Sequence, residues 1–505
     1  MKNRFLDKPT VFQYFSFLLP FLVYTSYYVN SFYHYGDTVL DSGWFIYLST
    51  NFTNLLLQNP SVLFPTHLGE TYLNTHVSFI FAIFSFLYET LFFWISPEIY
   101  FALVLSFFYA LLSLSAFMIL LHLSINIYLT FLLSLLVAFN AQSLAMAGFP
   151  HFEIAIPSLM ILFFALYIKQ NKKASYAVFA LLLITREDAG LHFFGLVFVF
   201  VCIEYIKTNS IQISKELIKF AIIAIVYSIA VIIMQKIFFH TDDAFTRIYA
   251  GADFFAHLDS LFLIKRTEFL LAQREYLYIP MVLLFFSALF TKNYYLLIPI
   301  FSILPWTILS ICAITDMPGT LSNYYAFLFI LLFAWIPIAF YFHAKSTNVT
   351  TQKGVFFTMF SVVVSSMLLF PNAQGNVDSA PWQRVFPPSQ KEIAYTHKFK
   401  EYLKEHKEKF GNILFDEAMS LFAIDSLSYN EYLYINTFSK NETGKKQREG
   451  FTTLIFKERS SKHLMHELIK EKNLKYIYKV KHTDIVIASL QKIPMASFFI
   501  LQTDR

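Results

Sequence analysis

The chain has 505 residues, of which 56% are hydrophobic and only 14% are charged, and its formal net charge is +5. A soluble globular protein carries about 25% charged residues, so this composition excludes a soluble enzyme and predicts an integral membrane protein. Aromatic residues make up 19% of the chain, and we expect them mostly to face lipid and the membrane interface. Both cysteines lie inside apolar runs without metal-ligand spacing, and no nucleotide fingerprint or nucleic-acid-binding pattern occurs.

The first apolar run, residues 11–29, is predicted to span the membrane, because it is long enough and lacks a small-residue cleavage site. Three basic residues precede it and place the N-terminus in the cytoplasm. The run 77–95 could be a second span. Treating it as an interfacial or re-entrant helix instead puts four later basic loops on the cytoplasmic side, so we expect interfacial helices in a first outer segment over residues 30–98.

About eleven spans are expected in a transmembrane domain over residues 1–370. Those after the first cover residues 99–121, 127–145, 154–168, 176–184, 191–206, 218–238, 276–290, 294–313, 324–342 and 355–370. Prolines in residues 371–388 mark a linker, and residues 389–505 are predicted to form an α/β domain. Its expected strands are 413–415, 432–435 and 453–456, followed by a hairpin of 475–480 and 484–490. An odd number of spans from a cytoplasmic start makes this domain extracytoplasmic.

Two carboxylates, Asp37 and Asp41, follow the first span at the expected outer edge of the membrane. Apolar helices behind Asp41 could raise its proton affinity and let it act as a general base. The alternative is a carboxylate that is solvated or caps the helix beginning near Trp44, and Asp37 has the same ambiguity.

His76 and His151 begin or precede helices on the same outer face. Each could bind a phosphate or orient a carboxylate, although a lone histidine at a helix end is more often structural. The basic residues Arg247 and Arg266 lie in a long outer loop. They could neutralise a lipid-linked phosphate, or simply meet anionic headgroups as interfacial loops do.

Three consecutive charges, Arg186, Glu187 and Asp188, interrupt two apolar runs. Exposed to lipid they would cost several kcal/mol, so they must face a polar cavity or the surface. Glu187 and Asp188 could hold a divalent metal ion or a sugar, with Arg186 pairing with one of them or with a phosphate. The alternative is a turn between two short helices.

Several short motifs follow one another in a particular order over about residues 30–345. They are Asp41-Ser42-Gly43-Trp44-Phe45, His76-Val77-Ser78, His151-Phe152-Glu153, Arg186-Glu187-Asp188 and Asn323-Tyr324-Tyr325. In this order they resemble the bacterial membrane protein family called domain of unknown function 2079, which looks like a distant branch of the GT-C polytopic glycosyltransferases. The last motif departs from the family, because Asn323 stands where the family tends to have a histidine.

The resemblance implies an α-helical polytopic, GT-C-like membrane enzyme that uses a polyprenyl-phosphate sugar as donor. Asp41, with Asp37 beside it, would be the catalytic carboxylate that deprotonates an acceptor hydroxyl, which attacks the anomeric carbon with inversion. Substrate-binding roles would fall to the remaining candidates. These are His76, His151, Glu153, Arg186, Glu187, Asp188, Arg247, Arg266 and Tyr324, with Glu187 and Asp188 as possible ligands of a divalent metal ion.

We therefore expect a glycosyltransferase of the bacterial cytoplasmic membrane that contacts membrane lipid and acts on a glycan, lipid or protein acceptor. The alternative is a non-enzymatic lipid or glycan transporter, or a scaffold for envelope assembly. A transporter is expected to carry polar residues in the middle of several spans and two related halves. Here the carboxylates gather on one face and no repeat is visible, which favours the enzyme.

Overall fold

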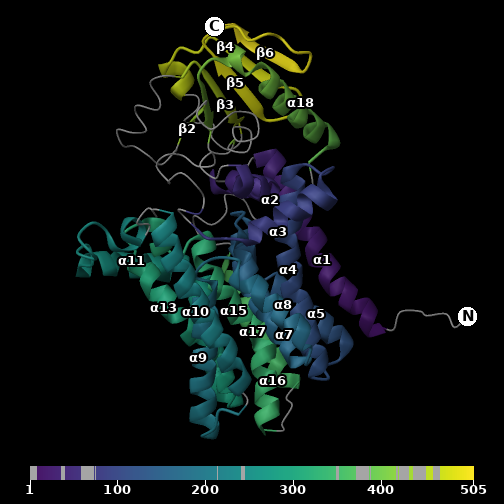
Figure 1. The fold of residues 1–505 in the computed structure, drawn as a ribbon, viewed down its shortest axis with the longest axis vertical. Helices are drawn as coiled ribbons and strands as arrows, with labels where there is room; N and C mark the ends of the chain where they lie inside the picture. Colours follow the sequence, from purple (N-terminus) through teal and green to yellow (C-terminus); the bar gives the residue numbers. More distant parts are fainter. Residues whose placement is uncertain are drawn as a thin grey trace, which may run out of the picture.

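The computed structural model describes residues 8–35, 40–58, 73, 76–212, 214–239, 245–347, 352–370, 386, 388–416, 419, 432–435, 451–458 and 467–504. Within these ranges a long helical domain carries a smaller mixed sheet at one end (Figure 1). Its first helices are α1 (Lys8–Asn30), η1 (Ser31–Tyr35), α2 (Leu40–Gln58), α3 (Ile80–Leu87), η4 (Tyr88–Phe92), α4 (Pro97–His122), α5 (Ile127–Ala138), α6 (Ala141–Ala147), η5 (Phe152–Ile154), α7 (Ala155–Ile168) and α8 (Lys172–Leu183). The later ones are α9 (Ala189–Thr208), α10 (Lys215–Phe238), η6 (Thr246–Ala250), α11 (Ser260–Gln273), α12 (Glu275–Thr291), η7 (Tyr294–Leu297), α13 (Ile298–Ile311), α14 (Asp316–Gly319), η8 (Asn323–Ile330), α15 (Leu331–Ala334), α16 (Ile336–Thr347), α17 (Gln352–Leu369), α18 (Gln390–His406) and η11 (Lys407–Phe410).

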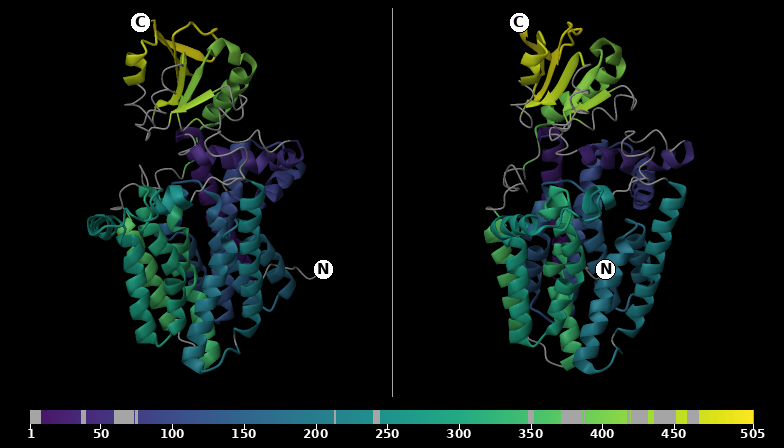
Figure 2. Two further views of the ribbon diagram at one scale, coloured as in Figure 1. Left: turned by 60° about the vertical axis from the view of Figure 1, so that its left-hand side comes forward. Right: turned by 90° about the vertical axis from the view of Figure 1, so that its left-hand side faces the viewer.

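Helices that can cross a membrane dominate the helical domain, where they run side by side away from the sheet (Figure 2). By length and composition six helices in the described residues qualify, or up to eight if each of two bent pairs is one span. The longest single helix, α4, has 26 residues and extends about 39 Å, more than the roughly 30 Å hydrocarbon core of a bilayer. The chain is therefore a multi-pass membrane protein, as its composition predicts.

The predicted total of about eleven spans is not confirmed. α7 has 14 residues and α8 has 12, so these helices extend only about 21 Å and about 18 Å. The predicted spans 127–145 and 276–290 each belong to a bent helix pair, with angles of 45° and 82°. An apolar run in a sequence shows how much apolar surface a segment has, but not where its helix bends or stops.

Aromatic side chains pack inside the bundle as well as on its surface, so the expectation that they mostly face lipid was too broad. The Tyr24 ring stacks on Tyr109 of α4 with 4.0 Å between centroids, and its hydroxyl donates to the Ala138 carbonyl at 2.7 Å. Trp335 is fully buried, and its Nε1 donates to the Tyr295 carbonyl at 3.0 Å. A buried Tyr or Trp needs such a partner for its polar atom, and these bonds tie neighbouring helices together.

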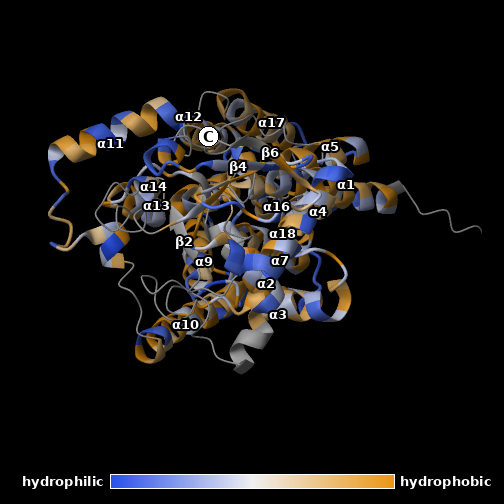
Figure 3. Cartoon of the chain, turned by 90° about the horizontal axis from the view of Figure 1, so that it is seen from above, coloured by the Kyte–Doolittle hydropathy of each residue, from blue (hydrophilic) through white to orange (hydrophobic). Residues whose placement is uncertain are grey.

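At the end of the bundle nearest the sheet, several helices do not follow the bundle axis. α2 lies between the bundle and the sheet (Figure 1). The run predicted as interfacial or re-entrant forms α3 and η4, a short apolar helix over Ile80–Phe92 that is below spanning length. α11 makes an angle of 82° with α12, and viewed from above it lies at the periphery with hydrophilic and hydrophobic residues alternating along it (Figure 3).

The sheet has six strands in the order β2-β1-β3-β5-β4-β6. β1 is parallel to its neighbours β2 and β3, whereas the other pairings are antiparallel, so the sheet is mixed. The strands are β1 (Ile413–Asp416), β2 (Tyr432–Ile435), β3 (Thr453–Lys457), β4 (Tyr476–Val480), β5 (Ile485–Ser489) and β6 (Phe499–Asp504). The first five agree with the expected positions, while β6 was not predicted. α18 packs on one face through Phe399 and Leu403.

The sheet domain contacts the helical domain through a small polar interface. Lys400 of α18 lies 2.8 Å from Glu98 in the first turn of α4, and their side chains are only 7% and 3% exposed. His397 Nε2 lies 2.8 Å from the Tyr33 hydroxyl, and Lys457 of β3 donates to the Tyr33 carbonyl. These contacts hold α18 and β3 above η1 and the beginning of α4.

Candidate charged site

Arg186 lies where α8 ends and α9 begins, at the end of the bundle near the sheet. Its Nη1 donates to Glu153 at 2.9 Å, while Nε and Nη2 donate to the two carboxylate oxygens of Asp188 at 2.6 and 2.7 Å. The side chain is only 6% exposed, and its guanidinium lies 5.2 Å from the centroid of the Phe327 ring. Two-pronged Arg–carboxylate pairs are strong and fix direction. In the described structure Arg186 therefore holds two carboxylates in place.

Glu153 connects Arg186 to an aromatic stack. It is fully buried in η5, and its second oxygen is hydrogen-bonded to His151 Nδ1. The imidazole of His151 lies parallel to the Tyr324 ring, with 3.8 Å between centroids and an interplanar angle of 1°. Phe45 of α2 meets the same imidazole edge-on at 4.4 Å. Packing on both sides and the bond to Glu153 fix the orientation of this histidine.

Glu187 joins this network to the segment before α3. One carboxylate oxygen lies 2.8 Å from His76 Nδ1, and the other accepts the Val77 backbone N–H at 2.9 Å. Nearby, the Ile80 N–H donates to the Ile184 carbonyl at 3.0 Å, so backbone and side-chain bonds join the same two segments. His76 is 34% exposed, which makes it the most accessible histidine among those bonded to the carboxylates of this network.

Asp188 is the residue that precedes α9. Besides Arg186 it contacts His192, which lies one helical turn later. The His192 Nε2 is 3.2 Å from the Asp188 carboxylate. The His192 ring packs edge-on against Trp306 and Phe327, with centroid distances of 5.4 Å to each. The charged network is thus bordered by aromatic rings from α13 and η8.

Glu153 and Asp188 are held in their charged form. Burial alone raises the pKa of Glu153, but the neighbouring His151 and Arg186 outweigh this and lower the pKa below its ordinary value. Burial also raises the pKa of Asp188, but Arg186 and His192 outweigh it and hold the pKa well below its usual range. As carboxylates these groups accept hydrogen bonds, so the histidine nitrogens facing them are the donors.

The pKa of His76 shifts upward, because its main partner, Glu187, is negatively charged. Burial lowers the pKa of the imidazole, but the charge of Glu187 and the hydrogen bond to it together raise the pKa above its ordinary value. Arg186 lowers it by a smaller amount. His76 is therefore a partly exposed imidazole whose protonated form is favoured at the edge of the site.

α2 forms one wall of the site. The Ser42 hydroxyl donates to the Pro150 carbonyl at 3.1 Å, immediately before His151 in the chain. The backbone of Asp41 lies in the first turn of α2, directly before Ser42. The Asp41 side chain and the whole of Asp37 lie outside the described residues.

Most of the predicted substrate-binding residues come together in this network, although they are distant in the sequence. Those that meet are His76, His151, Glu153, Arg186, Glu187, Asp188 and Tyr324. Arg266 does not join them: it lies on α11 and reaches Asp316 and the Ala313 carbonyl at 3.3 Å each. Arg247 is exposed in η6, two residues before Tyr249, whose ring packs on Trp306 at the border of the site.

Glu187 and Asp188 do not form a joint metal site in the described structure. The first faces His76 and Val77, whereas the second faces Arg186 and His192. Among the described residues, no group of three His, Cys, Asp or Glu side chains is arranged to hold a metal ion. The prediction grouped these two adjacent acids as ligands of one metal ion, because the sequence does not show that their side chains point in different directions.

Three residues of this site, His192 and the α2 residues Ser42 and Phe45, were not among the predicted site residues. The spacing of four residues between Asp188 and His192 places both on one helix face, so the histidine was predictable. No sequence pattern indicates that Phe45 packs on His151, because that contact joins separate helices.

The sequence matches no known protein-family model, and no curated protein matches it either.

Proposed function

We propose that the protein is a membrane glycosyltransferase of GT-C type that transfers a sugar from a polyprenyl-phosphate donor to an acceptor on the extracytoplasmic side. The observation that carries the proposal is the network around Arg186, in which separate segments bring three carboxylates and three histidines to one end of the bundle. Such a group of charges is costly near a membrane and is retained mainly where it has a function.

In the proposed reaction an acceptor hydroxyl attacks the anomeric carbon of the donor sugar. Its oxygen forms the new glycosidic bond, its proton passes to the Asp41 carboxylate, and the bond from the anomeric carbon to the phosphate oxygen breaks. The polyprenyl phosphate leaves with the electron pair, and the configuration inverts. Asp41 is assigned this role because its backbone adjoins the wall of the site and because of the resemblance described above.

Within this scheme the network supplies position and charge. Protonated His76, favoured by Glu187 and partly exposed, is suited to bind the departing phosphate. Arg186, Glu153 and Asp188 are positioning residues, because they bind one another and hold His151 and His192 in place. We further propose the about eleven-span topology in a bacterial cytoplasmic membrane, which puts this site and the sheet domain outside the cytoplasm.

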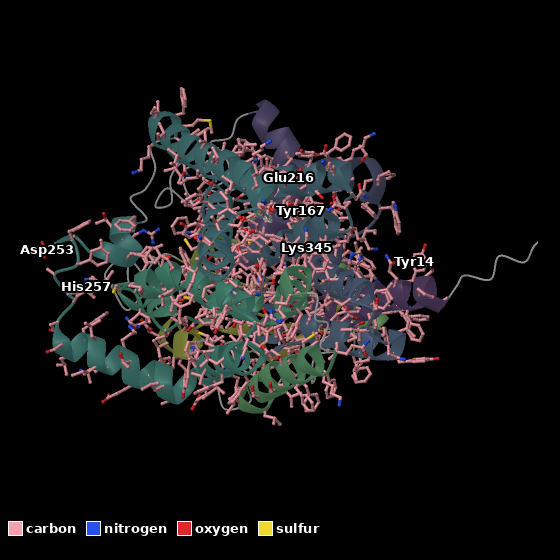
Figure 4. All side chains as sticks on the ribbon, turned by 90° about the horizontal axis from the view of Figure 1, so that it is seen from below. Tyr14, Tyr167, Glu216, Asp253, His257 and Lys345 are labelled. Carbon is pink, nitrogen blue, oxygen red and sulfur yellow. The ribbon has the colours of Figure 1, made fainter. Side chains whose placement is uncertain are left out.

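The test is the transfer of labelled sugar in membranes that contain the wild type, Asp41→Asn, Glu187→Gln or Asp253→Asn, with a panel of polyprenyl-phosphate sugars. Asp253 is exposed at the edge of the molecule and is not a member of the network, so its variant is a matched loss of one carboxylate (Figure 4). We expect transfer by the wild type and Asp253→Asn, and a loss of about 100-fold or more in Asp41→Asn at equal protein level.

Transfer by Asp41→Asn at the wild-type rate would contradict the assignment of the base. If no donor yields product with the wild type, and labelled lipid or glycan instead crosses vesicles that contain the protein, the transporter alternative replaces the enzyme.

A further inference from the structure

A second polar region lies at the opposite end of the helical domain. An open cavity of about 800 Å³ is bounded by the end of α4, the last turns of α16 and the beginning of α17. Figure 4 looks onto this end and shows Lys345 there, together with Tyr167 and Glu216. The cavity is therefore separated from the network around Arg186 by the length of the bundle, and the proposed transfer reaction does not use it.

The charge of the cavity has one sign. Its described lining contains His122, Lys345 and Lys353, but no carboxylate. The two lysines are exposed and form no ion pair with another described residue. Two ammonium groups without an acid favour an anion with several oxygen acceptors, and a phosphate has this chemistry.

Neutral hydrogen-bonding groups complete the rim. Gln352 Nε2 donates to the Ser124 carbonyl at 3.0 Å, which links the beginning of α17 to the loop after α4. The Tyr341 ring lies 5.5 Å from the His122 ring and gives the cavity an aromatic side. The cavity is thus framed by contacts between helices rather than by a single surface loop.

An apolar strip leads from the cavity along α17. Phe357 and Phe360 follow Lys353 by about one and two helical turns, so all three share one side of the helix. They are 65% and 48% exposed. In a membrane these rings face acyl chains, with the lysine at the level of the head groups, which is the arrangement that a phospholipid offers.

We propose that this cavity binds the phosphate head group of an anionic phospholipid from the adjacent leaflet, with Lys345 and Lys353 as its main cationic contacts. The ligand chemistry is that of a phosphate ester. The apolar strip beside Lys353 favours a lipid over a soluble phosphate as its source.

The test measures binding of fluorescent phosphatidylglycerol and fluorescent phosphatidylcholine to the full-length protein in detergent micelles. The double variant Lys345→Gln/Lys353→Gln should bind phosphatidylglycerol at least about tenfold more weakly, since it removes both cationic contacts to the head group. The matched control is Lys169→Gln/Lys173→Gln, which removes two exposed lysines from the neighbouring α7–α8 turn. It should stay within about twofold of the wild type.

Lys345→Arg/Lys353→Arg should retain binding, because it keeps both charges. Equal losses in the two Gln variants would overturn the proposal, since general surface charge would then explain binding. Equal affinity of the wild type for both lipids would also overturn it. Displacement of the lipid by inorganic phosphate at about millimolar concentration would contradict the lipid as the source and assign the cavity to a soluble phosphate. Thermal unfolding of each variant checks that it is folded.

Discussion

At the scale of single residues, Arg186 decides how the charged site is built. Its guanidinium is shared between Glu153 and Asp188, which are separated by more than thirty residues in the chain. Buried ion pairs of this kind contribute little net stability, but removal of one partner leaves a charge uncompensated in a low dielectric. The network is therefore a means of fixing geometry, and its members are sensitive to substitution whether or not they contact a substrate.

The raised pKa of His76 should make the stability of the protein depend on pH. Because its folded-state pKa is raised, His76 stabilises the fold fully below its unfolded pKa of about 6.5, and this contribution is lost as the pH rises through the raised value. The difference in melting temperature between the wild type and His76→Gln should therefore be larger at about pH 5.5 than at about pH 9.

Thermal unfolding in detergent at several pH values measures this difference. In a Glu187→Gln background, which removes the negative partner, the pH dependence of the difference should largely disappear. A difference that grows with increasing pH would contradict the assigned direction of the pKa shift.

At the scale of elements, close helix packing positions the segment that carries the charges. Gly190 lies in the first turn of α9 just after Asp188, and a Cβ built there would be 2.3 Å from the Ala224 carbonyl oxygen of α10. The neighbour is backbone, so it cannot move aside as a flexible side chain would. α9 and α10 can approach this closely only because residue 190 is glycine.

Gly190→Ala is therefore expected to destabilise the protein by about 1–3 kcal/mol through overpacking, despite the higher helix propensity of alanine. The matched control is Gly195→Ala in the same helix, where the nearest atom to a built Cβ is the Ser302 carbonyl oxygen at 3.9 Å. That variant should be neutral or up to about 1 kcal/mol more stable.

Reversible denaturant unfolding of the two variants, followed by tryptophan fluorescence, gives the comparison. Equal stabilities would mean that the helices are not in close contact at Gly190. Reduced transfer activity in Gly190→Ala alone would also connect the packing to the position of Asp188.

At the scale of the whole molecule, the sheet domain is attached to the bundle by few contacts, of which the Lys400–Glu98 pair is the most buried. The domain stands over the end of the bundle at which α2, one wall of the charged site, lies (Figure 1). Its attachment therefore bears on how the acceptor of the proposed reaction would approach the site.

Lys400→Met should leave Glu98 buried without its cation and weaken the attachment by about 3–5 kcal/mol. Adding Glu98→Leu should recover most of this loss, because replacing both partners by apolar groups is nearly neutral. Hydrogen exchange of the backbone amides of α18 measures the effect, with faster exchange expected in the single variant only.

The control for this comparison is Lys398→Met, which changes an exposed lysine two residues earlier on the same helix. Slow exchange of α18 in Lys400→Met, equal to that of the control, would contradict the role of the buried pair. Fast exchange in the double variant would show that other contacts depend on the charges.

The sequence alone was sufficient for several features of the fold. The apolar runs predict most helices, and alternating hydrophobic stretches predict five of the six strands. β6 was not predicted, because its residues Phe499–Asp504 lack a clear alternating hydrophobic pattern. The expected number of spans was not confirmed, because hydropathy does not reveal the bends between α5 and α6 or between α11 and α12.

For the site, the order of the motifs identified His76, His151, Glu153 and the charged triplet as candidates, and these residues do meet. The separate argument from basic residues in the long outer loop proposed Arg266, which the structure places on α11 with other partners. The sequence argument applies equally to any basic residue in an outer loop. Which loop reaches the site depends on the fold, and Arg266 contacts Asp316 and the Ala313 carbonyl instead of the network.

Three properties can be read from the amino-acid sequence. They are the membrane character of the chain, its division into an apolar helical part and a polar mixed part, and the types of residue available for chemistry. These follow from composition and local periodicity, which are properties of short segments. The folded arrangement was needed to show that Glu187 and Asp188 face different partners, that Tyr324 covers His151, and that Lys400 reaches Glu98. These contacts join residues far apart in the chain, or depend on side-chain directions that adjacent positions do not share, so no local pattern contains them.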